Sequence, residues 1–544
     1  MAHDASPTGA VPADHDPIAS GADDTFGIDP GIYARRWQIH SVLCVSLVAI
    51  VAAVSSLNVA IPTIIEALEP SPTQTLWIVD SYALVFAGLL LPAGAVGDRF
   101  GRKKALQIGI VIFGTMALVA SFANSANALI AARAVMGIGA ALIMPATLSI
   151  ITNVFPPHER AKAIAAWAGL SGAGGALGPL LSGLILKADL WWGAVFLINV
   201  PIAILLFSLV ALRVPESKDP SGHALDPVGV VLSIVTLGSL VFGIIEAPEY
   251  GWSSARVLAA LGLSLVAGLG FVAYESRTAQ PMLDPRLFRF RGFSVGALTI
   301  TCAFFCMFGT FYALTLYLQF VKGYSPLGAA LRTLPQAVVM VLVAPRSPRL
   351  VAKIGVHNNV RLGFATLAVA YLIMSRFTVD TPYWVIMICL VLLAVGMAVM
   401  TAPTSAVIVG SLPLAKAGVG SAVNDVTREV GGVLGIALMG SFLSTGYASK
   451  IVDRLAGSPI PDGPRHAIEE SIGVAFGVVD RGLAEGTITN DQAEGIRAIA
   501  RESFITGNRN AFLAAFGVAV IGGLIVGTFM PKDAGDHRPA AGSS

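Results

Sequence analysis

Long apolar runs constrain this chain more than any other feature of its 544-residue sequence. A helix needs ~20 apolar residues to cross the ~30 Å hydrocarbon core of a bilayer. Only 12% of the residues are charged, against the ~25% that is usual in soluble domains. We therefore predict an all-α polytopic membrane protein with fourteen transmembrane helices. They are expected at residues 38–64, 76–96, 104–123, 128–153, 160–186, 193–213, 227–247, 256–275, 293–320, 326–346, 360–377, 383–408, 417–445 and 508–530.

The distribution of positive charge predicts the orientation of these helices. Most of the 35 Lys and Arg residues fall in the termini and loops on the side of residues 1–36, and few fall in the short loops of the opposite side. Short cytoplasmic loops carry such an excess in membrane proteins. We therefore expect a multi-pass protein of the cell (inner or plasma) membrane with both termini in the cytoplasm. Residues 1–36, rich in Ala, Pro, Gly and Asp, are expected to form a disordered tail, and residues 532–544 a short one.

A basic turn separates the second and third predicted helices. It reads GAVGDRFGRKK from Gly94 to Lys104 and places five charges within its last seven residues. Gly94 and Gly101 permit close approach and a sharp reversal of the chain. Asp98 is placed to accept from backbone N–H groups of a neighbouring helix end or to pair with Arg102, which predicts a latch on a gate. The alternative is a plain topological anchor, for which basic residues such as Arg99 suffice.

A weaker copy of this turn occurs at residues 344–355, APRSPRLVAKIG. It indicates that the last six helices repeat the first six, and that the two helices between them are an insert. Two six-helix halves that face each other across a midplane site are the usual architecture of secondary transporters. The predicted divisions are a half at 37–213, an insert with cytoplasmic linkers at 214–292, and a half at 293–531 that includes an extracytoplasmic loop at 447–507.

Two further motifs accompany the turn. Residues 129–141 read LIAARAVMGIGAA, with Arg133 inside a predicted helix, and residues 174–183 read GGALGPLLSG. Together with the turn, they resemble the signatures of the 14-spanner drug:proton antiporter family within the major facilitator superfamily. The resemblance extends from residue 57 to the end of the last helix. In the second motif, Gly174, Gly178, Pro179 and Gly183 weaken the helix and let a neighbour pack closely.

The resemblance implies a proton-coupled secondary antiporter that exports lipophilic small molecules, cations among the candidates, by alternating access. It also implies that the bend in helix 160–186 favours exchange over import. The partners are then a small lipophilic substrate, protons and the lipid bilayer. Neither enzymatic activity nor a nucleic acid, cofactor or metal is expected: Cys302 and Cys306 share a helical face without a nearby His or acid. The protein is expected to be monomeric.

Charges inside the predicted helices point to the site, because such groups are costly in lipid unless they face a cavity or a partner. At 1.5 Å per residue, Asp80 lies ~6 Å into helix 76–96 and Arg133 ~9 Å into helix 128–153, both from the outer face. The two side chains can therefore meet at similar depth. Protonation of Asp80 would then release Arg133, which makes this pair a candidate for coupling. The alternative is a purely structural ion pair.

Helix 417–445 carries a second group of charges. Asp425 and Glu429 are four residues apart and share one face, whereas Asn424 and Arg428 share the adjacent face. Glu429 is expected near the midplane, where a buried carboxyl group can exchange a proton near neutral pH and attract a cationic substrate. Alternatively, Arg428 neutralises one acid permanently. Apolar and cation–π contacts to the substrate are expected from Trp77, Tyr82, Phe304 and Phe311.

The sequence also departs from the family pattern. The family places an Asp five residues before the Asn of an N-V-A-x-P motif; here Asn58 begins that motif and Ala53 stands at the position of the acid. One carrier of a proton or cation is missing, which bears on stoichiometry and on any preference for dications. Glu66 and Glu246 lie at predicted helix ends and are expected to be solvated.

Two other functions fit the same sequence. The first is export of an endogenous lipid, siderophore or secondary metabolite. The second is a non-transporting membrane receptor or lipid-handling scaffold, which has no need of acids at the midplane. An ATP-driven pump is disfavoured because the sequence contains no G-x-x-x-x-G-K-[ST] phosphate-binding loop.

Overall fold

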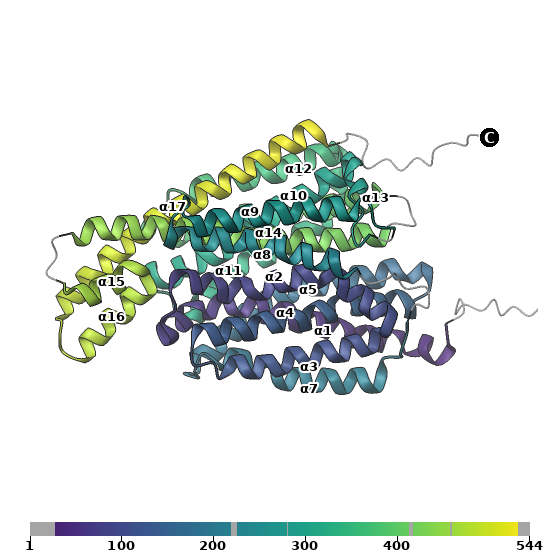
Figure 1. The fold of residues 1–544 in the computed structure, drawn as a ribbon, viewed down its shortest axis with the longest axis horizontal. Coiled ribbons are helices and arrows are strands. Elements are labelled where there is room, and N and C mark those ends of the chain that lie inside the picture. The colour runs from purple at the N-terminus through teal and green to yellow at the C-terminus, as the bar shows by residue number, and fades with distance from the viewer. Residues whose placement is uncertain (1–27, 219–225, 280, 413–416, 457–459, 531–544) are drawn as a thin grey trace, which may run out of the picture.

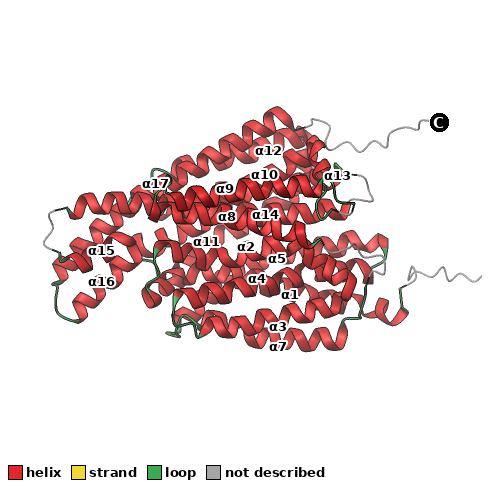
Figure 2. Cartoon of the chain, in the orientation of Figure 1, coloured by secondary structure: helices red, strands yellow, loops and turns green. Residues whose placement is uncertain are grey.

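The structure is a computed structural model, and it describes residues 28–530 except 219–225, 280, 413–416 and 457–459. In this part of the chain every regular element is a helix (Figure 2). Most helices run along the length of one elongated bundle, and α1 begins at the same end of it as α17 finishes (Figure 1). The predicted all-α fold is therefore confirmed.

The helices fall in the order that the apolar runs predict. The N-terminal part holds α1 (Pro30–Leu68), α2 (Pro72–Phe100), α3 (Arg102–Ser121), α4 (Ala126–Val154), α5 (Pro157–Lys187), α6 (Ala194–Leu197) and α7 (Asn199–Arg213). Next come α8 (Pro227–Tyr250), α9 (Ala255–Glu275) and the 3-10 turn η1 (Pro285–Arg289). The C-terminal part holds α10 (Arg291–Leu316), the π-helical turn η2 (Tyr317–Val321), α11 (Pro326–Val343), η3 (Ala344–Arg346), α12 (Ser347–Met374), α13 (Tyr383–Gly410), α14 (Ala417–Leu455), α15 (Asp462–Glu470), α16 (Ile472–Ala484) and α17 (Asn490–Phe529).

Twelve helical stretches in the described part of the chain are long and apolar enough to cross a membrane. Each of the fourteen predicted ranges overlaps a helix. One of the twelve stretches, Pro326–Met374, takes in two predicted helices, whereas α5 is represented only by a shorter apolar piece, Gly174–Lys187. The number of fourteen spans therefore stays a prediction.

The two ends of the bundle differ. The 94–104 turn lies at one end, which we call the turn end. At the other end α14 and α17 extend beyond the bundle and carry α15 and α16 (Figure 1), and we call this the capped end. There the Tyr447 hydroxyl donates to the Ile468 carbonyl over 2.8 Å, and Arg481 pairs with Glu69 over 2.9 Å. These contacts join α15 to α14 and α16 to α1.

The predicted loop at 447–507 is largely helical. Its last part, from residue 490, belongs to α17 and is not a separate element. A capping box explains where α17 begins, because the Thr489 hydroxyl accepts from the Gln492 N–H and the Gln492 side chain accepts from the Thr489 N–H. Only residues 456–489 lie between α14 and α17.

Equivalent glycine contacts occur in the two parts of the bundle. A Cβ atom on Gly109 of α3 would lie 2.7 Å from the Gly139 carbonyl of α4, and one on Gly139 would lie 2.8 Å from the Gly109 carbonyl. Gly363 of α12 and Gly396 of α13 have the same reciprocal relationship, at 2.9 and 2.8 Å. Such contacts let helices approach closely in lipid. They support the predicted repeat, in which α12 and α13 correspond to α3 and α4.

Candidate functional site

Asp80 of α2 and Arg133 of α4 are brought together in the N-terminal part, and both are almost completely buried. No ion pair joins these two side chains. Arg133 instead donates from Nε to the Ile78 carbonyl (3.1 Å) and from Nη2 to the Val79 carbonyl (3.3 Å). Neither carboxyl oxygen of Asp80 has a hydrogen-bond partner. The direct pair that similar depth suggested is therefore not formed, because backbone carbonyls of α2 accept from the guanidinium group.

Tyr82 connects this group to the opposite part of the bundle. The Arg133 guanidinium lies 4.7 Å from the centroid of the Tyr82 ring. The Tyr82 hydroxyl is buried without a hydrogen-bond partner and interacts electrostatically with Glu429 of α14. Asp80 interacts in the same way with Tyr312 of α10. Asp80 and Tyr82 of α2 thus lie close to groups on α10 and α14 of the C-terminal part, respectively.

The charges of α14 lie where that helix faces α2 and α10. Arg428 Nη1 is 3.7 Å from Asp425 Oδ1, and its guanidinium lies 4.7 Å from the centroid of the Phe304 ring. Asn424 accepts from the Ser405 hydroxyl over 2.9 Å. Glu429 is half-buried and forms no ion pair with another described side chain. Arg428 therefore forms its ion pair with Asp425, and it also acts electrostatically on Glu429, which has no ion pair of its own with a described residue.

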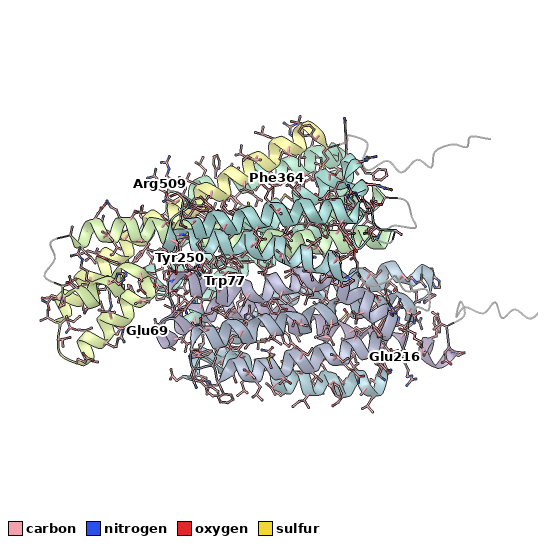
Figure 3. The ribbon with its side chains drawn as sticks, in the orientation of Figure 1. Glu69, Trp77, Glu216, Tyr250, Phe364 and Arg509 are labelled. Atoms are coloured by element: carbon pink, nitrogen blue, oxygen red, sulfur yellow. The ribbon has the colours of Figure 1, made fainter. Side chains whose placement is uncertain are left out.

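The turn end has the geometry that its sequence predicts, with one addition. Arg102 donates from Nε to Asp98 Oδ1 over 2.7 Å, and Gly101 ends α2 at a φ of 120°, which favours glycine. Glu216 was not predicted to take part: its carboxylate accepts from the Lys103 N–H over 3.1 Å. It lies at the turn end, far from Glu69 of the capped end (Figure 3). The one sequence signal for this contact is that Glu216 follows the end of α7 by three residues.

The remaining glycine of the turn and the side chain of Arg99 have simpler surroundings. A Cβ atom on Gly94 would make an ordinary contact with Pro145 of α4, at 3.5 Å. The guanidinium of Arg99 lies 5.6 Å from the centroid of the neighbouring Phe100 ring. Neither residue contributes to the Asp98–Arg102 pair.

The glycine motif of α5 packs against both parts of the bundle. A Cβ atom on Gly178 would collide with Ser55 and the Ala52 carbonyl of α1. Gly174 lies against the same helix, whereas Gly183 faces α11, where an added Cβ would lie 2.7 Å from Leu327 Cα. Pro179 lies inside α5, which stays one continuous helix on both sides of the proline. The motif thus forms a seam between α1, α5 and α11.

Glu246 is buried and not solvated as expected, because α8 packs against α2 and α14. Only 8% of its surface is exposed. Its carboxylate accepts from Trp77 Nε1 over 3.3 Å and pairs with Arg256 Nη2 over 3.5 Å. Glu246 lies at the end of the predicted range 227–247, and for that reason it was expected to contact water. The expected exposure of Glu66 is confirmed.

A pair of acids at the ends of α8 and α9, Asp226 and Glu275, was not predicted either. Asp226 caps α8 by accepting from the Gly229 N–H over 2.9 Å. Its other oxygen is buried and unpartnered, as is Oε1 of Glu275 at the end of α9, and the two carboxyl groups interact directly. No described cation pairs with either acid.

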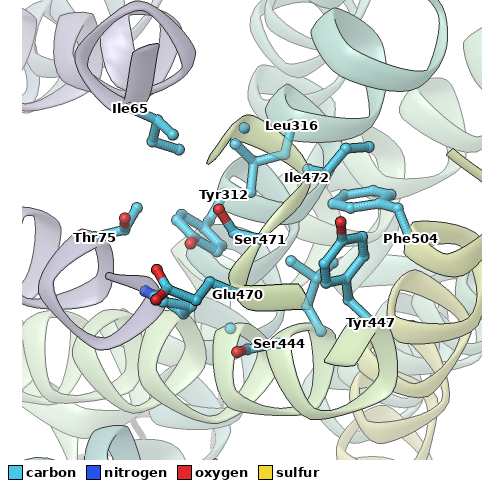
Figure 4. A pocket seen from close by; sticks show the side chains of 14 residues that line it. Ile65, Thr75, Tyr312, Leu316, Ser444, Tyr447, Glu470, Ser471, Ile472 and Phe504 are labelled. Atoms are coloured by element: carbon cyan, nitrogen blue, oxygen red, sulfur yellow. The ribbon is translucent and has the colours of Figure 1, made fainter. Parts of the chain in front are cut away.

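A pocket lies at the capped end between the bundle and α16 (Figure 4). Polar side chains from α2, α14 and the α15–α16 junction face it. Its lining includes Thr75, Tyr312, Ser444, Tyr447, Glu470 and Ser471. Because Tyr312 also interacts with Asp80, the pocket lies next to the buried acid of α2.

Comparisons with known proteins agree on one family. Residues 43–436 match the model of the Major Facilitator Superfamily. The multidrug efflux pump LfrA of Mycolicibacterium smegmatis is 38% identical over 446 residues, which is 82% of this chain and 87% of that protein. The tetracenomycin C resistance and export protein of Streptomyces glaucescens is 31% identical over 519 residues, 93% and 94% of the two chains. The methyl viologen resistance protein SmvA of Salmonella typhimurium is 33% identical over 420 residues, 77% and 84% of the two chains.

Solved structures share the fold at low sequence identity. A bacterial homolog of the human lysosomal transporter Spinster, in an inward-facing and unoccupied conformation, superposes with a TM-score of 0.62 at 18% identity and covers 90% of this chain and 96% of its own. A D-xylose-proton symporter gives a TM-score of 0.55 at 14% identity, with 91% and 98% covered.

Proposed function

This chain belongs to the Major Facilitator Superfamily, and we propose that it is a proton-coupled exporter of lipophilic small molecules, with organic monocations as its main substrates. These relatives are named for multidrug efflux, for resistance to and export of tetracenomycin C, and for methyl viologen resistance. Transport in this fold proceeds by rocking of two halves around a central site. In our proposal the turn end and both termini face the cytoplasm, as the distribution of Lys and Arg indicates.

One observation carries the proposal: two acids that form no ion pair lie at the interface between the halves, Asp80 beside Tyr312 of α10 and Glu429 beside Tyr82 of α2. Asp80 has no hydrogen-bond partner, and Glu429 lies within electrostatic range of Tyr82, two residues further along α2. A buried carboxyl group without a counter-ion is costly in its charged form. Each acid is therefore stable either protonated or with a bound cation, which makes proton and cationic substrate compete.

The substrate class follows from the same charges. Ala53 stands where the family pattern places an acid on α1, and it is buried, so the buried part of the first helix offers no negative charge to a second positive centre. Arg428 already compensates Asp425. Glu429 is then the principal acid available to cargo, which favours a single positive charge, and the Phe304 ring beside Arg428 adds an apolar wall.

Contacts between the halves gather at the capped end, which supports an arrangement closed on that side. Gln319 of η2 donates to the Val59 carbonyl of α1 over 3.0 Å. Gly440 of α14 lies against Leu76 of α2, and Gly183 of α5 lies against Leu327 of α11. We infer that these contacts separate when cargo is released, and that Asp98 and Arg102 latch the turn end in the alternate state.

The decisive experiment uses purified protein in sealed vesicles with an imposed pH gradient. Accumulation of ethidium, a fluorescent lipophilic monocation, is expected with the wild-type protein and is expected to collapse when a protonophore is added. Glu429→Gln should lower the initial rate at least tenfold. A matched control is Glu502→Gln, which alters an exposed acid of α17 and should leave the rate unchanged. Equal ethidium accumulation with and without the gradient would overturn the proposal.

Export of an endogenous secondary metabolite is the second candidate. It is favoured by the relative that is named for export of tetracenomycin C. The same vesicles distinguish the two: if a neutral aromatic compound is driven by the pH gradient and Glu429→Gln has no effect on its rate, cation recognition is not the basis of selection.

A further inference from the structure

A cation already occupies an aromatic and acidic cluster at the capped end. The guanidinium of Arg256 lies 4.3 Å from the centroid of the Tyr250 ring and 5.2 Å from that of Phe242, and it pairs with Glu246. We propose that Glu246, Phe242, Tyr250 and Trp77 form a second binding site for an organic monocation, here called the α8 cage. In this proposal Arg256 is a tethered cation that the cargo displaces.

The acid of the α8 cage is built to hold a positive charge. Glu246 is more than nine-tenths buried, and Trp77 fixes one of its oxygens by donating from Nε1 over 3.3 Å. The Trp77 and Phe242 rings lie 6.2 Å apart between centroids and form one wall. An acid and aromatic faces together are the usual recognition elements for ammonium-type cations. A buried carboxylate without such a cation would carry an uncompensated desolvation cost.

The present occupant is held weakly. Arg256 makes a single contact with Glu246 at 3.5 Å, and 49% of its side chain is exposed. By contrast, Arg36 makes two hydrogen bonds with Glu159, at 2.7 and 3.0 Å. Arg256 is also the second residue of α9, where the helix dipole disfavours a positive charge. The arginine can therefore leave if another cation takes its place beside Glu246.

The α8 cage lies on the boundary that must open during release. Trp77 and Tyr250 both lie toward the capped end (Figure 3), and Trp77 is one helical turn from Asp80. Helix α8 contacts both halves there: Thr73 of α2 donates to Glu249 over 3.0 Å, and Ser441 of α14 donates to the Ile244 carbonyl over 2.8 Å. The role of the α8 cage as an exit site for cargo rests on the proposed function. The binding of a cation to the α8 cage does not depend on that function.

Equilibrium binding of ethidium to purified protein in lipid nanodiscs tests the α8 cage. The measurements are made by calorimetry at pH 8 without a gradient, in the Glu429→Gln background, so that the central acid does not contribute. Arg256→Ala should raise the affinity about tenfold, because it removes an internal competitor worth an exposed ion pair and a cation–π contact. Adding Glu246→Gln should abolish this gain.

A matched control lies at the same end of the molecule. Arg481 pairs with Glu69 over 2.9 Å and is also half-exposed, and no aromatic ring of a described residue accepts its guanidinium; Arg481→Ala should leave the affinity unchanged. Arg256→Gln provides a second variant if Arg256→Ala does not yield folded protein. Unchanged affinity in Arg256→Ala, or an equal gain in Arg481→Ala, would overturn the α8 cage. If ethidium binding follows this pattern but the protein shows no gradient-driven transport, the proposed function is overturned and the α8 cage is not.

Discussion

The guanidinium of Arg133 and the carboxyl group of Asp80 are buried side by side between α2 and α4, yet they share no hydrogen bond. Arg133 is held by two backbone carbonyls of α2. These hydrogen bonds therefore do not require Asp80 to be charged. This separation lets the acid change its protonation state while the helix contact persists.

Replacing Asp80 by Asn should uncouple transport without unfolding the protein. The amide has nearly the same shape, and no hydrogen bond to either carboxyl oxygen is lost. We expect gradient-driven ethidium transport to fall at least tenfold, while the amount of protein in the membrane stays within about 20% of wild type. The rate is measured in vesicles and the amount by immunoblotting. An unchanged rate would show that Asp80 does not carry the proton.

Replacing Asp98 by Asn should impair transport more than stability. The Asp98 and Arg102 side chains are 34% and 16% exposed, and an ion pair near the surface contributes only ~0–1 kcal/mol. We expect a melting temperature within about 2 °C of wild type and a clear loss of transport rate. Arg99→Gln is the control, because Arg99 contacts only the exposed Phe100 ring in the turn. If both variants transport equally well, the turn is an anchor and not a latch.

The glycine motif of α5 predicts a sharp positional effect. A Cβ atom at Gly178 meets side-chain and backbone atoms of α1, whereas none lies within 4 Å of a Cβ at Gly175. Overpacking of this kind costs ~1–3 kcal/mol. Gly178→Ala should therefore lower the melting temperature and the transport rate, and Gly175→Ala should change neither. Thermal denaturation in detergent, followed by tryptophan fluorescence, measures the difference. Equal effects at the two positions would contradict the packing seam.

The facing carboxyl groups of Asp226 and Glu275 predict a pH-dependent stability. At low pH a proton can be shared between them, whereas at high pH two buried negative charges repel each other. The wild-type protein should lose stability from this pair as the pH rises. Glu275→Gln replaces the repulsion by an amide donor, and should raise the melting temperature by about 1–3 °C at pH 8 and less at pH 5. A gain of the same size at both pH values would exclude repulsion as its cause.

Contacts within one helix or turn were predictable from sequence. Asp98 and Arg102 are four residues apart, so local geometry alone brings them together. The apolar runs likewise predict the helices, because each run must bury its backbone polar groups in lipid whatever its neighbours are. The extension of α14 and α17 beyond the bundle was not predicted, because the polar residues in these extensions resemble the composition of a loop.

By itself, the sequence determined that this chain is a helical membrane protein of the major facilitator type, and that Asp80, Arg133 and the charges of residues 425–429 lie within its apolar helices. Only the tertiary structure decided which partner each of those charges has. Asp80 and Arg133 lie at similar depth, but the rotation of α4 directs Arg133 to backbone carbonyls of α2. Glu246 is buried because α8 packs on α2 and α14. Depth along a helix follows from spacing in the chain, whereas the rotation and neighbours of a helix depend on how all the helices pack together.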